Sequence, residues 1–150
     1  MLIVIQRVRS AEVSSITGKS HSICQGLLLL VGVHRNDTAE TARLSADKIT
    51  KMRIFEDDNG KMNLDILSSG GSILSIPQFT LASDISKGNR PGFDTAAEPV
   101  KARELWIMLN ERLKSSNIEL KEGFFGEHML VNIENDGPVT FVMERNCGTY

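Results

Sequence analysis

Runs of valine, isoleucine and leucine near the amino terminus predict several strands. Residues 2–9 and 11–16 are rich in β-branched side chains, and turn residues follow at 17–19, a pattern typical of a β-hairpin. A third, short strand is expected at 20–24. The continuous apolar run at 27–33 has the length of a strand that is covered on both faces, so we expect it at the centre of a sheet.

Two segments carry the apolar period of a helix. The first follows Asp37, and Glu40 lies three residues later, which is the spacing of a capping box. Its apolar positions are Ala42, Ala46, Ile49 and Met52. The second segment has Pro99 near its first turn and ends at 115–117. Its apolar stripe comprises Ala102, Leu105, Trp106, Leu109 and Leu113, so each helix is expected to pack one face against a core.

The remaining strands are short. They are expected at 53–55, 72–76, 118–122, 128–134 and 139–144. Pro77 marks a sheet edge or a strand end because proline cannot donate to a sheet ladder, and the Asn-Asp-Gly-Pro sequence at 135–138 is typical of a turn. No repeat, linker or change of composition divides the chain. We therefore predict one α+β domain over 1–150, with about eight mainly antiparallel strands, two helices and a tail at 145–150.

Composition narrows the class of protein. Hydrophobic residues make up 41% and charged residues 24% of the 150 residues, as in folded globular proteins. The net charge of -2 means that a nucleic-acid partner needs a local basic patch. The amino terminus has neither the basic region of a secretory signal nor the length of a membrane span. We expect a cytoplasmic protein without a membrane partner.

The residues that commonly bind metals are scattered. His21, His34 and His128 stand singly, and Cys24 and Cys147 have no CxxC spacing and no histidine cluster. Both cysteines are expected to be free thiols. We therefore expect no metal site and no disulfide.

Two stretches place special residues beside apolar strands, although GxSxG, GxxxxGK, HExxH and GxGxxG motifs are missing from the sequence. In 77–81 a strand breaks, and Thr80 is either a nucleophile that lacks an evident base or an ordinary strand residue. In 135–140 a Gly-Pro pair is either a special main-chain feature or a simple turn. Neither stretch identifies an activity alone.

A third stretch is the loop 83–93, which has no apolar period. Its Lys87 and Arg90, with Arg7 and Arg9, are suited to holding phosphates, but a solvated loop has the same composition. The pattern favours a binding loop only if other observations support a nucleic-acid substrate.

Together these stretches resemble, in order and spacing, the D-aminoacyl-tRNA deacylase family over about residues 1–144. The matching segments are 5–8, 47–49, 53–57, 60–64, 78–81, 87–88, 90–91, 125–126 with Met129, and 135–140. Each segment is ordinary alone, whereas the set is specific.

The resemblance implies an activity and an assembly. It implies a barrel-like α/β fold, a homodimer, and a carboxylic ester hydrolase that frees tRNA and a D-amino acid from D-aminoacyl-tRNA in a proofreading step of translation. Glycyl-tRNA mischarged on tRNA(Ala) is expected as a further substrate, because glycine has no side chain to reject. The partner is the 3′ end of aminoacyl-tRNA, and no cofactor is expected.

The resemblance also assigns roles to residues. Catalysis falls to Gln78, Phe79 and Thr80. Backbone N–H groups around Phe79 and Thr80 are suitable donors to the ester oxyanion, and the 2′-hydroxyl of the terminal adenosine assists. Chirality falls to Gly137 and Pro138, which enter the partner's site with a cis peptide and block the L configuration, with Arg7 holding them in place. Substrate and tRNA binding are assigned to Met129, Phe125, Gly126, Lys87, Arg90 and Asn135.

One departure from the family pattern keeps alternatives open. Family members typically have Ser-Gln-Phe-Thr-Leu, and here Pro77 replaces the serine, which removes a hydroxyl and a backbone N–H. A related deacylase that acts on misacylated L-alanine also has proline there but lacks a phenylalanine equivalent to Phe79. The alternatives are therefore a relaxed L-alanyl-tRNA deacylase and a non-catalytic module that binds the tRNA end.

Overall fold

The computed structural model describes residues 1–86 and 88–145, and this part of the chain contains eight strands, two α-helices and one 3-10 turn. The elements are β1 (Leu2–Ser15), β2 (Ser20–Ile23), β3 (Gly26–Gly32), α1 (Ala39–Thr50), β4 (Phe55–Glu56), β5 (Met62–Leu64), β6 (Ser72–Pro77), η1 (Phe79–Ala82), α2 (Pro99–Lys114), β7 (Leu120–Glu122) and β8 (Met129–Glu144). The expected α+β class with mainly antiparallel pairing and two helices is confirmed.

The two longest strands, β1 and β8, pair antiparallel along their whole length, from Leu2 opposite Glu144 to Ser15 opposite Met129. The sequence prediction of two strands in each of these regions is wrong. The register shifts near Val8, where β8 accommodates its Asn-Asp-Gly-Pro stretch as an irregularity instead of reversing direction. Both halves of β8 keep the same neighbour, so the turn signal bends one strand and does not separate two.

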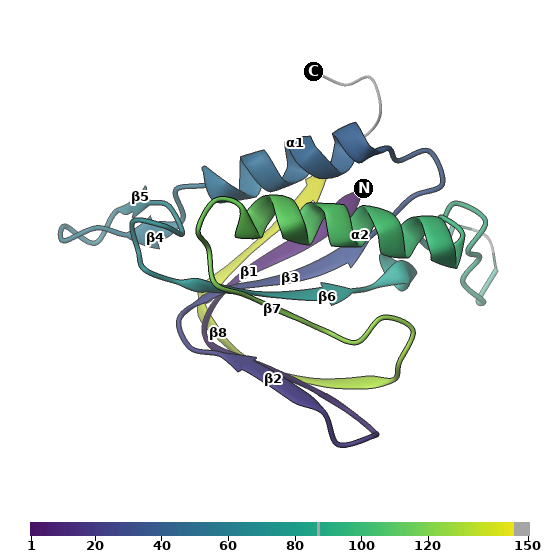
Figure 1. Cartoon of the computed structure of the whole chain (residues 1–150), viewed down its shortest axis with the longest axis horizontal. Helices are drawn as coiled ribbons and strands as arrows, with labels where there is room; N and C mark the ends of the chain where they lie inside the picture. The colour runs from purple at the N-terminus through teal and green to yellow at the C-terminus, as the bar shows by residue number, and fades with distance from the viewer. Residues whose placement is uncertain (87, 146–150) are drawn as a thin grey trace.

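The strand β3 lies at the centre of the sheet, as expected. It pairs antiparallel with β1 and parallel with β6, and β7 extends the sheet from β6. The sheet bends so that β2 and the far halves of β1 and β8 curve away from the helices, which gives a nearly closed, barrel-like form (Figure 1). Pro77 is the last residue of β6, opposite Val31, and the pairing with β7 ends at Ser75. The missing N–H of Pro77 therefore interrupts no ladder with β7.

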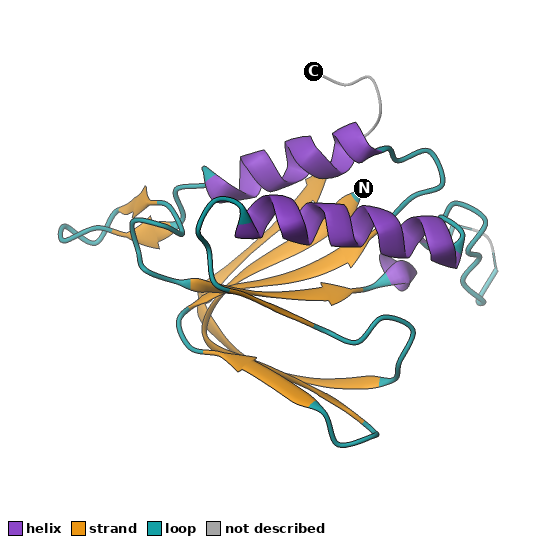
Figure 2. Ribbon diagram, viewed as in Figure 1, coloured by secondary structure: helices purple, strands orange, loops and turns teal. Residues whose placement is uncertain are grey.

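The two helices lie side by side on one face of the sheet (Figure 2). All five residues of the expected stripe on α2 are buried in the main core. Alternate residues of the central strands and the apolar face of α1 also contribute, among them Ile3, Ile5, Leu27, Leu29, Ala46 and Ile49. A smaller cluster on the opposite face contains Val8, Val13, Leu28 and Leu74. Neither helix in the described ranges is long and apolar enough to cross a membrane.

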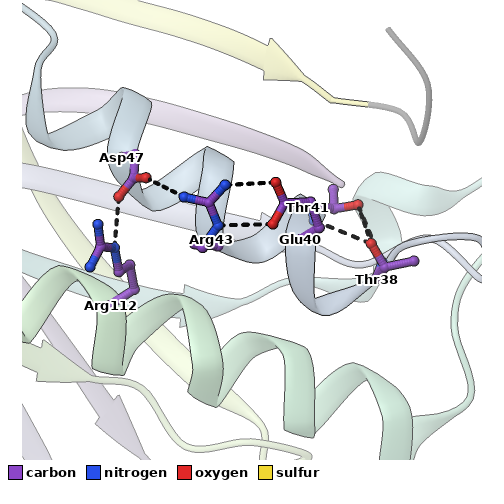
Figure 3. Close-up of polar contacts among 6 residues, drawn as sticks. All are labelled: Thr38, Glu40, Thr41, Arg43, Asp47 and Arg112. Carbon is purple, nitrogen blue, oxygen red and sulfur yellow. Dashed lines mark hydrogen bonds and ion pairs between the residues drawn. The ribbon is translucent and has the colours of Figure 1, made fainter. Parts of the chain in front are cut away.

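The amino-terminal cap of α1 differs from the sequence prediction. Thr38, not Asp37, is the N-cap, and it exchanges hydrogen bonds with Thr41 (Figure 3). The buried carboxylate of Asp37 instead pairs with the ammonium group of Met1 and accepts a hydrogen bond of 2.7 Å from the N–H of His34. The carboxylate of Asp37 therefore binds the distant ammonium group of Met1 and does not cap α1.

Ion pairs join the outer faces of the two helices. Arg43 lies between Glu40 and Asp47, at 2.6 Å and 3.1 Å, and Arg112 of α2 reaches Asp47 at 2.7 Å (Figure 3). The hydrogen bond from Arg112 is the main cause that holds the pKa of Asp47 below its ordinary value. Asp47 thus connects α1 to α2.

The expected strand at 53–55 is shorter and lies later, as β4, which pairs with β5 in a separate small sheet. A turn joins them, and the carboxylate of Asp57 accepts hydrogen bonds from the N–H groups of Asn59 and Lys61 at 2.9 Å and 3.1 Å. These bonds lower the pKa of Asp57, with the bond from Lys61 contributing most.

Candidate functional site

A cavity of about 550 Å³ lies at the carboxyl end of β6, between η1 and the segment that connects β7 to β8. Five of the expected site residues line it, namely Gln78, Phe79, Phe125, Gly126 and Met129. Pro77 also lies on its wall, and apolar side chains such as Val31, Ala97 and Ala102 complete it. The fold therefore brings together two segments that are almost fifty positions apart in the sequence.

The turn η1 is held tightly against β3. The N–H of Gln78 donates to the carbonyl oxygen of Val31 at 2.8 Å, and the N–H of Leu81 donates to that of Gln78 at 3.2 Å. A Cβ added at Gly32 would lie 2.8 Å from the Cβ of Leu81 and 3.2 Å from the oxygen of Gln78. Only glycine permits this close approach, so Gly32 allows η1 to lie against β3 beside the cavity. The sequence reasoning did not identify this role of Gly32.

The amides of Phe79 and Thr80 begin the turn. The first N–H groups of a helical turn have no acceptor inside it, because the preceding residues supply no carbonyl in the right place. Backbone N–H groups beside a cavity can stabilise a developing oxyanion. The strand break expected at 77–81 is confirmed by the end of β6 at Pro77, and the catalytic role of the turn stays a prediction.

The hydroxyl of Thr80 has no general base among its described partners. It accepts a short hydrogen bond from the side-chain amide of Gln78, and Thr80 is not among the residues that line the cavity. An amide cannot take the hydroxyl proton. The geometry thus favours a main-chain role for this residue over a nucleophilic one.

The opposite wall contains the residues expected to bind the substrate. The N–H of Phe124 lies 3.2 Å from the sulfur of Met129, and the ring of Phe125 lies 5.9 Å from that of Trp106. Trp106 is buried as expected, and its indole N–H donates to Ser75 at 2.9 Å. It also lines the cavity, which the helical stripe alone did not reveal.

Two titratable residues of this wall were missed or given little weight by the sequence reasoning. Glu127 lines the cavity, and one carboxylate oxygen pairs with Lys19 at 3.1 Å while the other is buried without a hydrogen-bond partner among the described residues. His128 is exposed, as expected, but it also contributes to the wall. No local motif marks either residue.

Gly137 and Pro138 do not line this cavity. They occur in the irregular part of β8, where Asn135 pairs with Val8 and Thr140 with Gln6, and both are exposed. Their peptide bond is cis, as the resemblance implies. Gly137 lies eight residues along β8 from Met129, a chain length of about 26 Å at about 3.3 Å per residue.

Arg7 lies beside this Gly-Pro pair instead of beside Phe79. Its guanidinium is 3.0 Å from Asp136 and 3.2 Å from Glu56, and it donates to the carbonyl of Ile54 at 2.9 Å. The side chain is almost fully buried. These contacts restrain Asp136, the residue that precedes Gly137, and the role in chirality that the resemblance assigns to Arg7 stays a prediction.

Arg7 also lines a second, more polar cavity of about 630 Å³, together with Arg9, Cys24, Glu56 and Asp136. Arg9 is exposed and lies 3.6 Å from Asp136. Cys24 is a free, exposed thiol, as expected, whereas Cys147 falls outside the described residues.

The remaining candidates are less closely connected to the cavity. Arg90 is exposed in the loop after η1 and does not line the cavity, and Lys87 lies outside the described residues. The side-chain amide of Asn135 is 3.4 Å from the hydroxyl of Thr140, near the Gly-Pro pair. No group of metal-binding side chains occurs within residues 1–86 and 88–145.

Fold and site define a class of protein. It is an α+β barrel-like domain whose cavity beside η1 has a mostly apolar lining, with Gln78, Glu127 and His128 as polar members among the described residues. Residues 4–144 match the D-Tyr-tRNA(Tyr) deacylase family, and the chain belongs to this family. The family resemblance seen in the sequence is confirmed.

Individual relatives agree with this assignment. The chain is 49% identical over 150 residues to a D-aminoacyl-tRNA deacylase of Staphylococcus carnosus, covering 99% of this chain and 98% of the relative. It is 48% identical over 149 residues to a D-aminoacyl-tRNA deacylase of Macrococcus caseolyticus, with the same coverage. Among solved structures, it is similar to a c-Myc DNA unwinding element binding protein, with a TM-score of 0.90, 34% identity, and coverage of 98% of this chain and 100% of that one.

Proposed function

We propose that this chain hydrolyses the ester bond of D-aminoacyl-tRNA and releases free tRNA and a D-amino acid. The observation that carries the proposal is the start of η1 at the cavity of about 550 Å³, where Gln78 and Phe79 lie on the wall with Phe125, Gly126 and Met129. In this proposal the amides of Phe79 and Thr80, at the start of η1, are the two oxyanion donors. Relatives at 48–49% identity have this activity in their names. Membership of the family and the main-chain site point to the same reaction.

The chemistry needs little from side chains. Water adds to the ester carbonyl carbon, the carbonyl oxygen becomes an oxyanion that accepts hydrogen bonds from the two amides, and the bond to the ribose oxygen then breaks. The leaving oxygen takes a proton, and the neighbouring 2′-hydroxyl of the terminal adenosine assists this transfer. Thr80 therefore acts through its N–H and not through its hydroxyl.

The adenosine lies against the wall formed by Phe125, Gly126 and Met129, which offers aromatic, thioether and backbone surface to a flat base. Lys87, Arg90 and Asn135 contact the RNA outside the cavity. The substrate is present where translation takes place, so a cytoplasmic location belongs to the proposal. No cofactor is required by this chemistry.

Handedness is decided by a second copy of the chain. Gly137 and Pro138 of one subunit enter the cavity of the other and leave no room for the side chain of an L-amino acid. Two observations support this arrangement. The pair is exposed, and neither Gly137 nor Pro138 lines the cavity of its own chain.

The exposed surface of β8 supports a dimer. This strand pairs only with β1 among the described strands, and it carries exposed apolar side chains at Leu130, Ile133, Phe141 and Val142. A long apolar edge strand is a surface that proteins normally cover. A second copy of the chain covers it and delivers the Gly-Pro pair.

The test compares hydrolysis of D- and L-forms of one aminoacyl-tRNA, with glycyl-tRNA and L-alanyl-tRNA alongside. We expect the D-ester to react at least about 100-fold faster than its L-counterpart, since each factor of ten requires only about 1.4 kcal/mol of steric cost. Glycyl-tRNA is also cleaved, because glycine has no side chain to exclude.

Two other results of this hydrolysis assay would each indicate a different function. Equal cleavage of L-alanyl-tRNA would identify the relaxed deacylase that Pro77 suggests. Retention of acyl-tRNA without release of the amino acid would identify a binding module and would overturn the proposed hydrolysis.

A further inference from the structure

The aromatic ring of Phe79 lies against a second ring that the catalytic proposal does not use. Phe93 is 5.1 Å from Phe79 between ring centroids, with the planes tilted by 55°. Both side chains are substantially exposed, at 60% for Phe79 and 41% for Phe93. A contact between two exposed rings contributes little to the hydrophobic core, so its effect is local to η1.

Phe93 has a fixed position in spite of its place after a long loop. Asp84 and Gly92 close the base of this loop with two backbone hydrogen bonds of 2.8 Å and 2.9 Å. The side chain and the N–H of Ser86 both hydrogen-bond to Asp84 and hold the pKa of its carboxyl below the ordinary value. Phe93 therefore follows a closed loop base, and its location does not depend on the tip of the loop.

The residues after Phe93 tie the same segment to the sheet and to the far end of η1. The N–H of Arg35 donates to the carbonyl oxygen of Thr95 at 2.9 Å, and the N–H of Ala97 donates to the carbonyl oxygen of Val33 at 3.0 Å. The hydroxyl of Thr95 donates a short hydrogen bond to the carbonyl of Ala82, the last residue of η1. One segment thus contacts η1 at its first residue through Phe93 and at its last residue through Thr95.

The other restraints on η1 within the described residues act mainly on its backbone: the N–H of Gln78 donates to Val31, and the N–H groups of Leu81 and Ser83 donate to Gln78 and Thr80. The turn has only four residues, and its N-cap, Gln78, makes no side-chain capping bond. Gly32 prevents η1 from being pushed away from β3 but does not set its rotation. The ring of Phe93 adds a contact to the side chain of Phe79, the first residue of this turn.

We propose that Phe93 is a positioning residue for the deacylation reaction. Its ring fixes that of Phe79 and thereby keeps the amides of Phe79 and Thr80 directed at the ester carbonyl. This inference depends on the proposed function. Oxyanion donors act through geometry, so a small rotation of the turn lowers the rate of the chemical step more than it lowers substrate binding.

The test measures kcat and KM for D-aminoacyl-tRNA in wild-type protein and in Phe93→Ala, Phe93→Leu and Phe93→Tyr. We expect Phe93→Ala to lower kcat about tenfold or more with KM changed less than about threefold, since a misdirected donor loses part of the 10²–10³ that such a donor supplies. Phe93→Tyr keeps the ring and restores kcat, whereas Phe93→Leu does not. Ile85→Ala is the matched control, because Ile85 is 74% exposed in the same loop.

The outcomes separate this inference from the proposed function. Absence of turnover in the wild-type protein would contradict the deacylase proposal itself. With an active wild type, an unchanged kcat in Phe93→Ala, or an equal loss in Ile85→Ala, would overturn the role of Phe93. If Phe93→Ala does not fold, equal kcat values for the leucine and tyrosine variants would overturn it.

Discussion

At the scale of single residues, the proposed mechanism predicts that catalysis depends on backbone N–H groups more than on side-chain chemistry. Thr80→Ala removes a hydroxyl whose described partner is the amide of Gln78 and leaves the N–H in place. We expect its kcat to remain within about threefold of the wild type, far from the loss of about 100-fold or more that follows removal of an oxyanion donor. Single-turnover hydrolysis of D-aminoacyl-tRNA measures this. A well-folded Thr80→Ala protein without turnover would show that the hydroxyl takes part in the reaction.

Gly137 is a second residue whose lack of a side chain matters. Its φ of +121° lies in a region that other residues rarely adopt, and an added Cβ would lie 2.5 Å from a methyl group of Val139. Gly137→Ala should displace the Gly-Pro pair and reduce the ratio of D- to L-ester hydrolysis by about tenfold or more, a change of about 1.4 kcal/mol.

The control for Gly137→Ala is Gly60→Ala. Gly60 also has a positive φ, of 71°, but it lies in the turn between β4 and β5 with no heavy atom within 4 Å of an added Cβ. It should leave the ratio unchanged. Equal ratios in the wild type and Gly137→Ala would contradict the role assigned to this residue.

At the scale of elements, the contact between α1 and α2 depends on pH. Asp47 binds Arg43 and Arg112, and its pKa is lowered chiefly by Arg112. A lowered pKa in the folded state gives stability above the unfolded pKa, and this stability is lost as the pH falls through the lowered value. Asp47→Asn should reduce the free energy of unfolding at neutral pH by about 0.2–1 kcal/mol, as for other exposed pairs.

Urea unfolding of wild type and Asp47→Asn at several pH values measures this difference. It should shrink as the pH is lowered below the unfolded pKa of aspartate and vanish once Asp47 is protonated in the folded state. A difference that stays constant into that acidic range would assign the effect to something other than the carboxylate charge.

At the scale of the whole molecule, the unpaired side of β8 is expected to join two copies of the chain. Val142 is 68% exposed on this strand, and Val142→Lys should place a charge in the interface. We expect a monomer by sedimentation equilibrium and a parallel loss of D-aminoacyl-tRNA hydrolysis, because the Gly-Pro pair no longer reaches the cavity of the partner. Met108→Lys, on the exposed side of α2, should remain dimeric. A monomeric Val142→Lys protein with full selective activity would contradict cross-subunit recognition.

Local patterns predicted some elements well and others poorly. The apolar stripe of α2 and the central strand β3 can be predicted from a few neighbouring residues. A helix buried on one face has apolar residues at helical spacing, and a strand buried on both faces has a continuous apolar run. The Asn-Asp-Gly-Pro stretch, by contrast, has the composition of a turn and lies inside β8, because the pairing of both flanking halves with β1 outweighs the local preference. The assignment of Asp37 to a helix cap was wrong because the ionic partner of Asp37, the ammonium group of Met1, is far away in the sequence.

The candidate site shows the same division. The segment 77–81 could be selected from sequence because Pro77 and the end of an apolar run mark a break in the sheet. Trp106 and Glu127 could not be placed at the cavity, since each fits an ordinary pattern in its own segment and only folding brings them beside Phe79.

The sequence by itself determined the family, the helical stripes, the central strand and the end of β6 at Pro77, because residue type and spacing indicate each of them. Only the tertiary structure decided that β1 and β8 are continuous and that Arg7 lies with the Gly-Pro pair away from the cavity containing Phe79. The physical reason is that strand pairing and ion pairs join residues more than a hundred positions apart. The energies of these interactions depend on which distant segments come together in the fold, and a local sequence pattern does not show which segments do so.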